Sequence, residues 1–74
     1  MKRIWFRDLR NAHGLSQEAL SRAADVSLKT VFRWEAGTAT PSRRHRRILA
    51  RLLGGEVLTR LAQELLAEST EVPA

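Results

Sequence analysis

The fold of this chain is decided by residues 15–37, which read LSQEALSRAADVSLKTVFRWEAG. Ser16 stands directly before polar residues, as an N-cap does, and predicts a helix over 17–24. Ser27 repeats this signal and predicts a second helix over 28–36, which the glycine at the end of the stretch closes as a C-cap. The two short helices are therefore expected to follow one another across a turn of about three residues.

The sequence on either side predicts three further helices. Apolar side chains recur there at helical spacing, and Trp5, Phe6 and Leu9 share one face of the first helix. Pro41-Ser42 offers another helix start. These helices are expected over 3–13, 43–53 and about 56–68, with a frayed tail over 69–74. Since no segment alternates like a strand, the expected fold is a compact, all-α, five-helix single domain over 1–74 with its core in 3–53.

Composition excludes several classes of protein and favours a polyanionic partner. The 74 residues include no cysteine, so neither a disulfide framework nor a thiolate zinc site is expected. No apolar run approaches the roughly 20 residues of a membrane span. Twelve basic and four acidic side chains give residues 1–53 a charge of +8, whereas residues 54–74 carry −3. A basic body with an acidic end points to a polyanionic partner such as nucleic acid. The lack of cysteine suits a reducing cytoplasm, and no cofactor is expected.

The chain resembles the phage repressor/Cro-type helix-turn-helix family over roughly residues 4–53. The similarity rests on Leu-Ser-Gln-Glu at 15–18 and on Trp-Glu-Ala-Gly at 34–37, together with Val26-Ser27, Val31 and Pro41-Ser42. Asp25 departs from the family by standing where a turn glycine is usual, although Asp tolerates the left-handed conformation better than most residues. The resemblance implies a repressor-like fold whose third helix lies in the major groove of DNA.

Four side chains of that third helix are the expected base readers. On a helical wheel Lys29 and Arg33 lie one turn apart and opposite Val31 and Trp34. Arg33 can bind guanine O6 and N7 in bidentate fashion, and Lys29 can reach the same acceptors. The resemblance places Leu28 at a base-contact position. The expected base-reading residues are Leu28, Lys29, Phe32 and Arg33.

Phe32 departs from the family, which usually has a small or polar residue there. A phenylalanine at this position is expected to be partly exposed. It could form an apolar patch with Leu28 that packs on thymine methyl groups or on a sugar edge. Alternatively, it could fold back over the first helix or meet a protein partner.

Phosphate contacts are expected at the edges of the motif. The resemblance implies that Gln17 binds a phosphate oxygen of DNA and braces the third helix. Backbone amides at a helix N-terminus also favour anions. The fourth helix carries five arginines and no acid, and they repel one another unless something neutralises them. The expected phosphate-binding residues are Ser16, Gln17, Ser27, Thr30, Thr38, Arg43, Arg44 and Arg47.

Two charged residues are expected to be structural. The resemblance pairs Arg10 on the first helix with Glu35 at the end of the third, which would fix the angle of that helix. His13 and His45 are expected to pack at the edges of their apolar faces, because without Cys or paired carboxylates they suggest neither a metal site nor a catalytic dyad. No enzyme is expected.

The last helix carries more apolar surface than packing on one neighbour requires. The surplus suggests a homodimer, which would place two recognition helices about one DNA turn apart on a palindromic site. The expected dimer contacts are Leu58, Ala62, Leu65 and Leu66. The overall prediction is a repressor-like, sequence-specific transcriptional regulator of prokaryotic or phage type, associated with the nucleoid. Two alternatives stay open: an antitoxin or DNA-binding subunit whose last helix meets a protein partner, and a protein-interaction adaptor without DNA binding.

Overall fold

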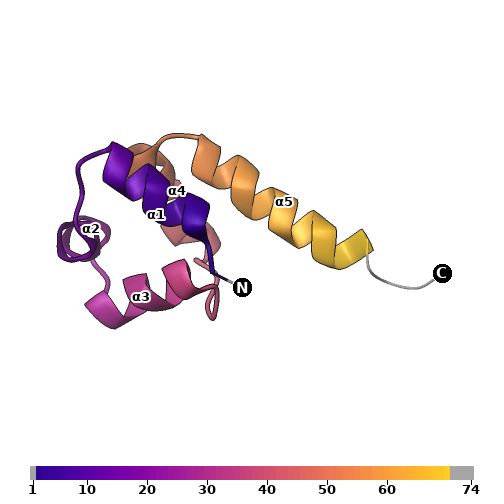
Figure 1. The fold of residues 1–74 in the computed structure, drawn as a ribbon, viewed down its shortest axis with the longest axis horizontal. Coiled ribbons are helices and arrows are strands. Elements are labelled where there is room, and N and C mark those ends of the chain that lie inside the picture. Colours follow the sequence, from indigo (N-terminus) through magenta and orange to yellow (C-terminus); the bar gives the residue numbers. More distant parts are fainter. Residues whose placement is uncertain (1, 71–74) are drawn as a thin grey trace.

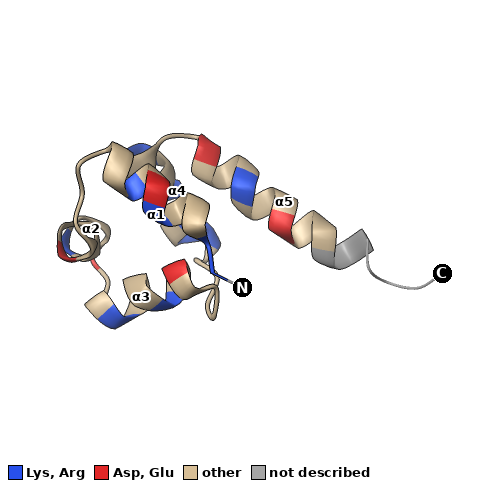
Figure 2. Ribbon diagram, viewed as in Figure 1, with Lys and Arg blue, Asp and Glu red and all other residues tan. Residues whose placement is uncertain are grey.

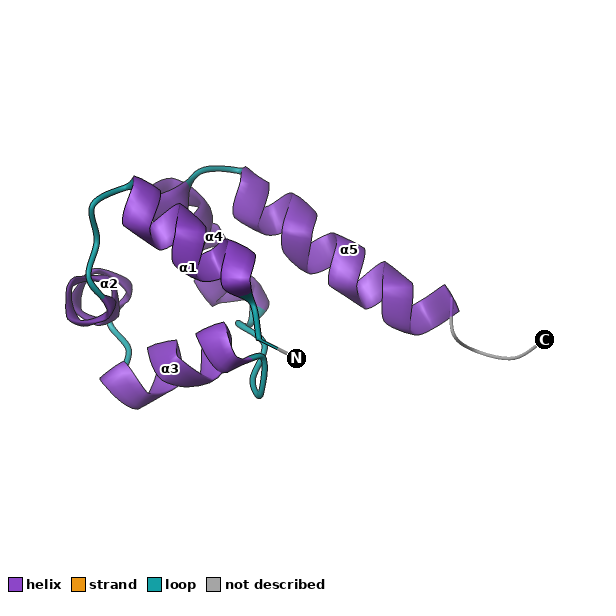
Figure 3. Cartoon of the chain, viewed as in Figure 1, coloured by secondary structure: helices purple, strands orange, loops and turns teal. Residues whose placement is uncertain are grey.

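Five helices follow one another along the chain, and residues 2–70, which are the part described by this computed structural model, contain no strand (Figures 1 and 3). The all-α prediction is therefore confirmed. The second, third and fourth helices begin and end at the predicted residues. The helices are α1 (Ile4–Ala12), α2 (Gln17–Ala24), α3 (Leu28–Ala36), α4 (Arg43–Leu53) and α5 (Glu56–Thr70).

Serine caps explain why the three central helices begin where they do. The Oγ atoms of Ser16, Ser27 and Ser42 each accept a hydrogen bond from the backbone N–H three residues on, at 3.0, 3.1 and 3.3 Å. Each bond satisfies a donor that has no partner within its helix. Because a cap joins residues only three apart, its position can be read from the sequence.

The turn between α2 and α3 keeps its left-handed geometry without a glycine. Asp25 has φ 56° and ψ 48°, and the N–H of the next residue, Val26, donates to Ser21 O at 2.9 Å. Gly37 ends α3 in the same region, with φ 80°. Asp25 therefore adopts the left-handed conformation that it was expected to tolerate in place of the usual turn glycine.

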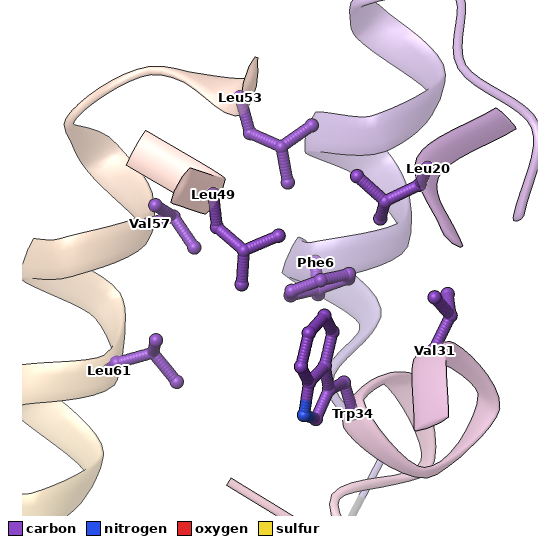
Figure 4. Packing of buried hydrophobic residues seen from close by; sticks show 8 residues of the cluster. All are labelled: Phe6, Leu20, Val31, Trp34, Leu49, Leu53, Val57 and Leu61. Carbon is purple, nitrogen blue, oxygen red and sulfur yellow. The ribbon is translucent and has the colours of Figure 1, made fainter. Parts of the chain in front are cut away.

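The core lies where the first four helices and the start of α5 meet. Figure 4 shows Phe6 and Trp34 next to each other at its centre, with ring centroids 6.3 Å apart. Val57 and Leu61 bring α5 into this cluster, and both are fully buried. The core residues are Phe6, Leu20, Val31, Trp34, Leu49, Leu53, Val57 and Leu61.

The two outer helices differ slightly from their predicted limits. Arg3 is the N-cap of α1 rather than its first residue, and α5 continues to Thr70, two residues beyond the predicted end. The second half of α5 extends away from the other four helices (Figure 1). Ser69 and Thr70, which were predicted to lie in a frayed tail, are therefore helical, and the rest of that predicted tail, 71–74, lies outside the described part of the chain.

Candidate nucleic-acid interface

The outer face of α3 presents two cations side by side. Val31 and Trp34 are buried against the core, and Lys29 and Arg33 are exposed on the opposite face. Figure 2 shows this basic edge of α3, on the side turned away from α1. Within residues 2–67, whose side chains the structure describes, neither cation forms an ion pair. Both are therefore available to a ligand that carries acceptor atoms.

Glu35 connects α3 to α1 and α2. Arg10 Nε donates to Glu35 Oε2 at 2.6 Å, and Gln17 Nε2 donates to Glu35 Oε1 at 3.2 Å. Arg10 Nη1 donates to Leu15 O at 2.8 Å, in the loop before α2. The side chains of Arg10 and Glu35 are only 9% and 12% exposed. The structure thus contains the pair that was expected from the family resemblance, and the pair fixes the end of α3 against the rest of the domain.

Gln17 lies at the first position of α2 and has donor capacity beyond its bond to Glu35. A glutamine amide carries two N–H donors, and one of them remains to meet a phosphate oxygen. The backbone amides at the start of α2 add further donors and the positive end of the helix dipole. Gln17 therefore braces α3 through Glu35 and keeps one N–H donor for the expected phosphate contact.

The hydroxyl groups expected at phosphates all make local hydrogen bonds. Ser27 Oγ lies 2.9 Å from Thr30 Oγ1 and caps α3, while Thr38 Oγ1 donates to Arg33 O at 3.4 Å. A hydroxyl can donate one bond and accept two, so these contacts leave capacity for another partner. Ser27 and Thr38 are exposed at opposite ends of α3.

A basic face runs along α4 on the side away from the core. Arg43, Arg44, Arg47 and Arg51 are exposed, whereas Arg46 is half-buried. Leu49 and Leu53 occupy the opposite, buried face. Arg43 and Arg44, the first residues of α4, follow directly after the loop that leaves α3. One short loop therefore connects the helices that carry the two basic faces.

Phe32 is half-exposed, as expected, and lies at the edge of α3 that faces α1 and α2. With Ile4 and Gln17 it lines an open hollow of about 260 Å³, whose rim also includes the cations Lys2 and Arg7. Leu28, one turn before Phe32, is half-buried. Phe32 therefore lies near the first residue of α2 and near α1.

The expected dimer contacts lie on the outer side of α5. Leu58, Leu65 and Leu66 are 41%, 46% and 64% exposed, and Ala62 is also exposed. Within residues 56–67 the other side of the helix, with Val57 and Leu61, enters the core. The apolar side chains that were expected to exceed the needs of packing are thus exposed on the surface of α5.

The two histidines have different environments. His45 packs against Trp34 with centroids 5.6 Å apart, as expected. His13 is exposed, with Nδ1 2.9 Å from Leu9 O, so its predicted packing at the apolar face is wrong. It is the C-cap of α1, just beyond the last helical residue. The described residues hold no group of three or more His, Cys, Asp or Glu that could bind a metal ion.

The burial of Arg3 was not predicted from the sequence, in which Arg3 is one of the basic residues of 1–53. It is only 6% exposed and Arg10 is also buried, so two of the twelve basic groups of residues 1–53 face inward. One signal could have identified Arg3. A cation at a helix N-terminus opposes the helix dipole and needs a compensating partner.

Comparison with known proteins agrees with this geometry. A family model described as Helix-turn-helix matches residues 6–59, which is more than half of the chain. No curated protein and no solved structure matches the chain. None of the helices in the described range is long and apolar enough to cross a membrane.

Proposed function

The chain belongs to the phage repressor/Cro-type helix-turn-helix family of DNA-binding proteins, and from that premise we propose that it is a dimeric, repressor-like transcriptional regulator. In this proposal α3 enters the major groove, and Lys29 and Arg33 read base edges there. The single observation that carries the proposal is the pair of exposed cations on α3, which stand on a helix fixed by Glu35, Arg10 and Gln17.

The proposed footprint has two sets of phosphate contacts, one on each side of α3. Gln17 and the amides at the start of α2 contact one strand, and the first arginines of α4 contact the other. Leu28 adds an apolar contact to a base. Phe32, at the α2 edge of α3, packs on a sugar or thymine methyl at the rim of the groove. Such a protein works where the chromosome is, in the prokaryotic cytoplasm, and needs neither a cofactor nor catalytic chemistry.

The exposed leucines of α5 support two forms of assembly. We favour a homodimer, because a two-fold axis would present two α3 helices to a palindromic site. The same surface could instead bind a different protein, as in an antitoxin or a subunit of a larger complex. Sedimentation of the isolated protein separates the two: a homodimer forms without a partner.

Mobility shift against random duplexes at two salt concentrations tests DNA binding itself. A DNA-binding protein loses affinity steeply as salt rises, because phosphate contacts release counterions. An adaptor without DNA binding shifts no duplex at either concentration, which would contradict the proposal. Selection of bound duplexes from a random pool then yields the operator and its symmetry.

Arg33→Ala is expected to cost about 1–3 kcal/mol of operator affinity and to relax specificity at one guanine. The reason is that Arg33 can form a bidentate contact to guanine, whereas Lys29 can donate only as a point charge. Repeating the duplex selection with the variant measures both effects. Arg60→Ala is the matched control, because it removes the same charge from an exposed site on α5 where Arg60 pairs with Glu56 at 3.3 Å. Equal affinity and specificity in the two variants would place Arg33 outside the groove.

Arg43→Ala with Arg44→Ala is expected to weaken binding to operator and random DNA alike. The slope of log K against log salt should fall by about one unit for each arginine that binds a phosphate in the parent protein. Affinity measured over a salt series gives this slope. Arg51→Ala is the control on the same face, eight residues further along α4 and therefore about 12 Å from Arg43. A double variant with unchanged affinity and slope would leave the α4 arginines in solvent.

A further inference from the structure

Arg3 forms hydrogen bonds with the C-terminal end of α3. The backbone N–H of Arg3 donates to Glu35 O at 2.7 Å, and its Nη1 donates to Trp34 O at 2.7 Å. These carbonyls belong to the last turn of α3, where carbonyl groups lack partners within the helix and the dipole is negative. The guanidinium therefore satisfies the end of α3 both by hydrogen bonding and by charge.

The same guanidinium also holds the loop between α3 and α4. Its Nη1 donates to Ala39 O at 2.7 Å, and its Nη2 donates to Thr40 Oγ1 at 3.1 Å. This loop carries Thr38 and leads directly to Arg43. Arg3 thus fixes the spacing between the helix proposed to read bases and the helix proposed to bind phosphates.

The Nε group of Arg3 reaches α5. Arg3 Nε donates to Glu64 Oε1 at 2.9 Å and to Glu64 Oε2 at 3.2 Å. Trp5 Nε1 donates to Glu64 Oε2 at 3.0 Å, so two residues at the start of the chain hold one carboxylate of α5. Glu64 is the counter-ion of a guanidinium that is only 6% exposed. Without α5 in place, that buried charge would lose its compensation.

We propose that Arg3 and Glu64 are positioning residues for DNA binding, which couple the docking of α5 to the geometry of α3 and the following loop. This inference rests on the proposed function. Arg3 is too deeply buried to meet DNA itself, so it acts only through the groups that it holds. Coupling of this kind is reciprocal: docked α5 favours the DNA-binding geometry, and bound DNA favours docked α5. A dimer or partner that holds α5 would thereby raise the affinity of the domain for its operator.

Glu64→Gln tests the coupling, and Glu56→Gln is its matched control. Both variants remove one negative charge from α5, but Glu56 is exposed and pairs only with the neighbouring Arg60 among the described side chains. Any electrostatic gain toward DNA is therefore similar in the two. We expect Glu64→Gln to bind the operator at least about fivefold more weakly than Glu56→Gln, at a temperature where melting curves show both folded. The ratio of operator to random affinity should fall, because a displaced α3 no longer meets the base edges while the phosphates stay within reach of the cations.

Amide hydrogen exchange on the parent protein supplies a second readout that needs no variant. Saturating operator DNA should slow exchange in the first half of α5, around Leu61, although this helix lies outside the proposed footprint. The same slowing should be absent in Glu64→Gln. These measurements separate positioning from stability, because a purely structural role would lower the folded fraction and weaken operator and random binding equally.

The outcomes distinguish failure of the coupling from failure of the proposed function. If the parent binds no duplex, the proposed function is wrong and the coupling falls with it. If the parent binds its operator but Glu64→Gln and Glu56→Gln have equal affinity and specificity, only the coupling is overturned. Unchanged exchange around Leu61 on DNA binding would overturn it as well, even if Glu64→Gln failed to fold.

Discussion

Leu61→Glu is expected to unfold the domain, whereas Leu66→Glu is expected to leave it folded. Leu61 is 1% exposed within the core, and Leu66, little more than one turn later, is 64% exposed. Loss of a buried leucine side chain alone costs about 2–5 kcal/mol. A carboxylate without a partner in the same place adds to that cost. A domain of this length has only about 4–11 kcal/mol of stability in total.

Far-UV circular dichroism and urea titration measure the first effect. Leu66→Glu is the matched control, because it introduces the same side chain on the same helix. A cooperative, parent-like urea transition in Leu61→Glu would show that the core does not need α5 at this position.

The same control variant tests the proposed dimer. Sedimentation should show that Leu66→Glu is a folded monomer. Its operator affinity should be much weaker than that of the parent, because one α3 helix then binds without the second α3 helix of a dimer. A parent that sediments as a monomer at high concentration, with operator binding unaffected by Leu66→Glu, would contradict the dimer. The coupling through Arg3 and Glu64 does not depend on that outcome.

Glu35→Ala is expected to be primarily a stability variant. Glu35 accepts bonds from Arg10 and Gln17, and its removal leaves the nearly buried Arg10 guanidinium without a counter-ion. Breaking such a pair costs about 3–5 kcal/mol, which in a domain of this size lowers the melting temperature by more than about 10 °C. Thermal melting followed by circular dichroism measures the change.

Two further variants control for charge and for the pair itself. Asp8→Ala removes an exposed carboxylate that lies 3.8 Å from Arg7, and it should change stability by less than about 0.5 kcal/mol. Arg10→Met combined with Glu35→Ala should recover part of the loss, because no uncompensated charge then remains. A melting temperature for Glu35→Ala within a degree or two of the parent would show that the pair contributes nothing in solution.

The helices and their order could be predicted because the signals that start and stop them are local. Each serine cap bonds to an N–H three residues away, and Gly37 adopts its left-handed conformation without help from distant residues. The exposed face of α3 also followed from helical spacing alone, since burial of Val31 and Trp34 leaves Lys29 and Arg33 outside. Errors in helix limits were confined to the ends of α1 and α5.

The Arg10–Glu35 pair was predicted, although no local signal in the sequence joins the two residues. Its members are 25 residues apart, and no periodicity within one helix joins them. The prediction came from a family whose members share the crossing of α1 and α3. The bond from Gln17 to Glu35 was not predicted, although the bracing role of Gln17 was, because the family pattern assigns roles without specifying atoms.

The five helices, the pairing of α2 with α3 and the cations on the outer face of α3 could be predicted from local sequence, because they depend on residues within one or two turns of each other. The contact between Arg3 and Glu64 becomes visible only in the folded chain, since these residues are 61 positions apart and lie in the basic body and the acidic end of the sequence. Their contact exists because Val57 and Leu61 seat α5 in the core and thereby carry Glu64 to the start of α1. The partner of a charged side chain depends on which residues the packing of apolar faces brings close to it. Residues near that side chain in the sequence therefore do not reveal the partner.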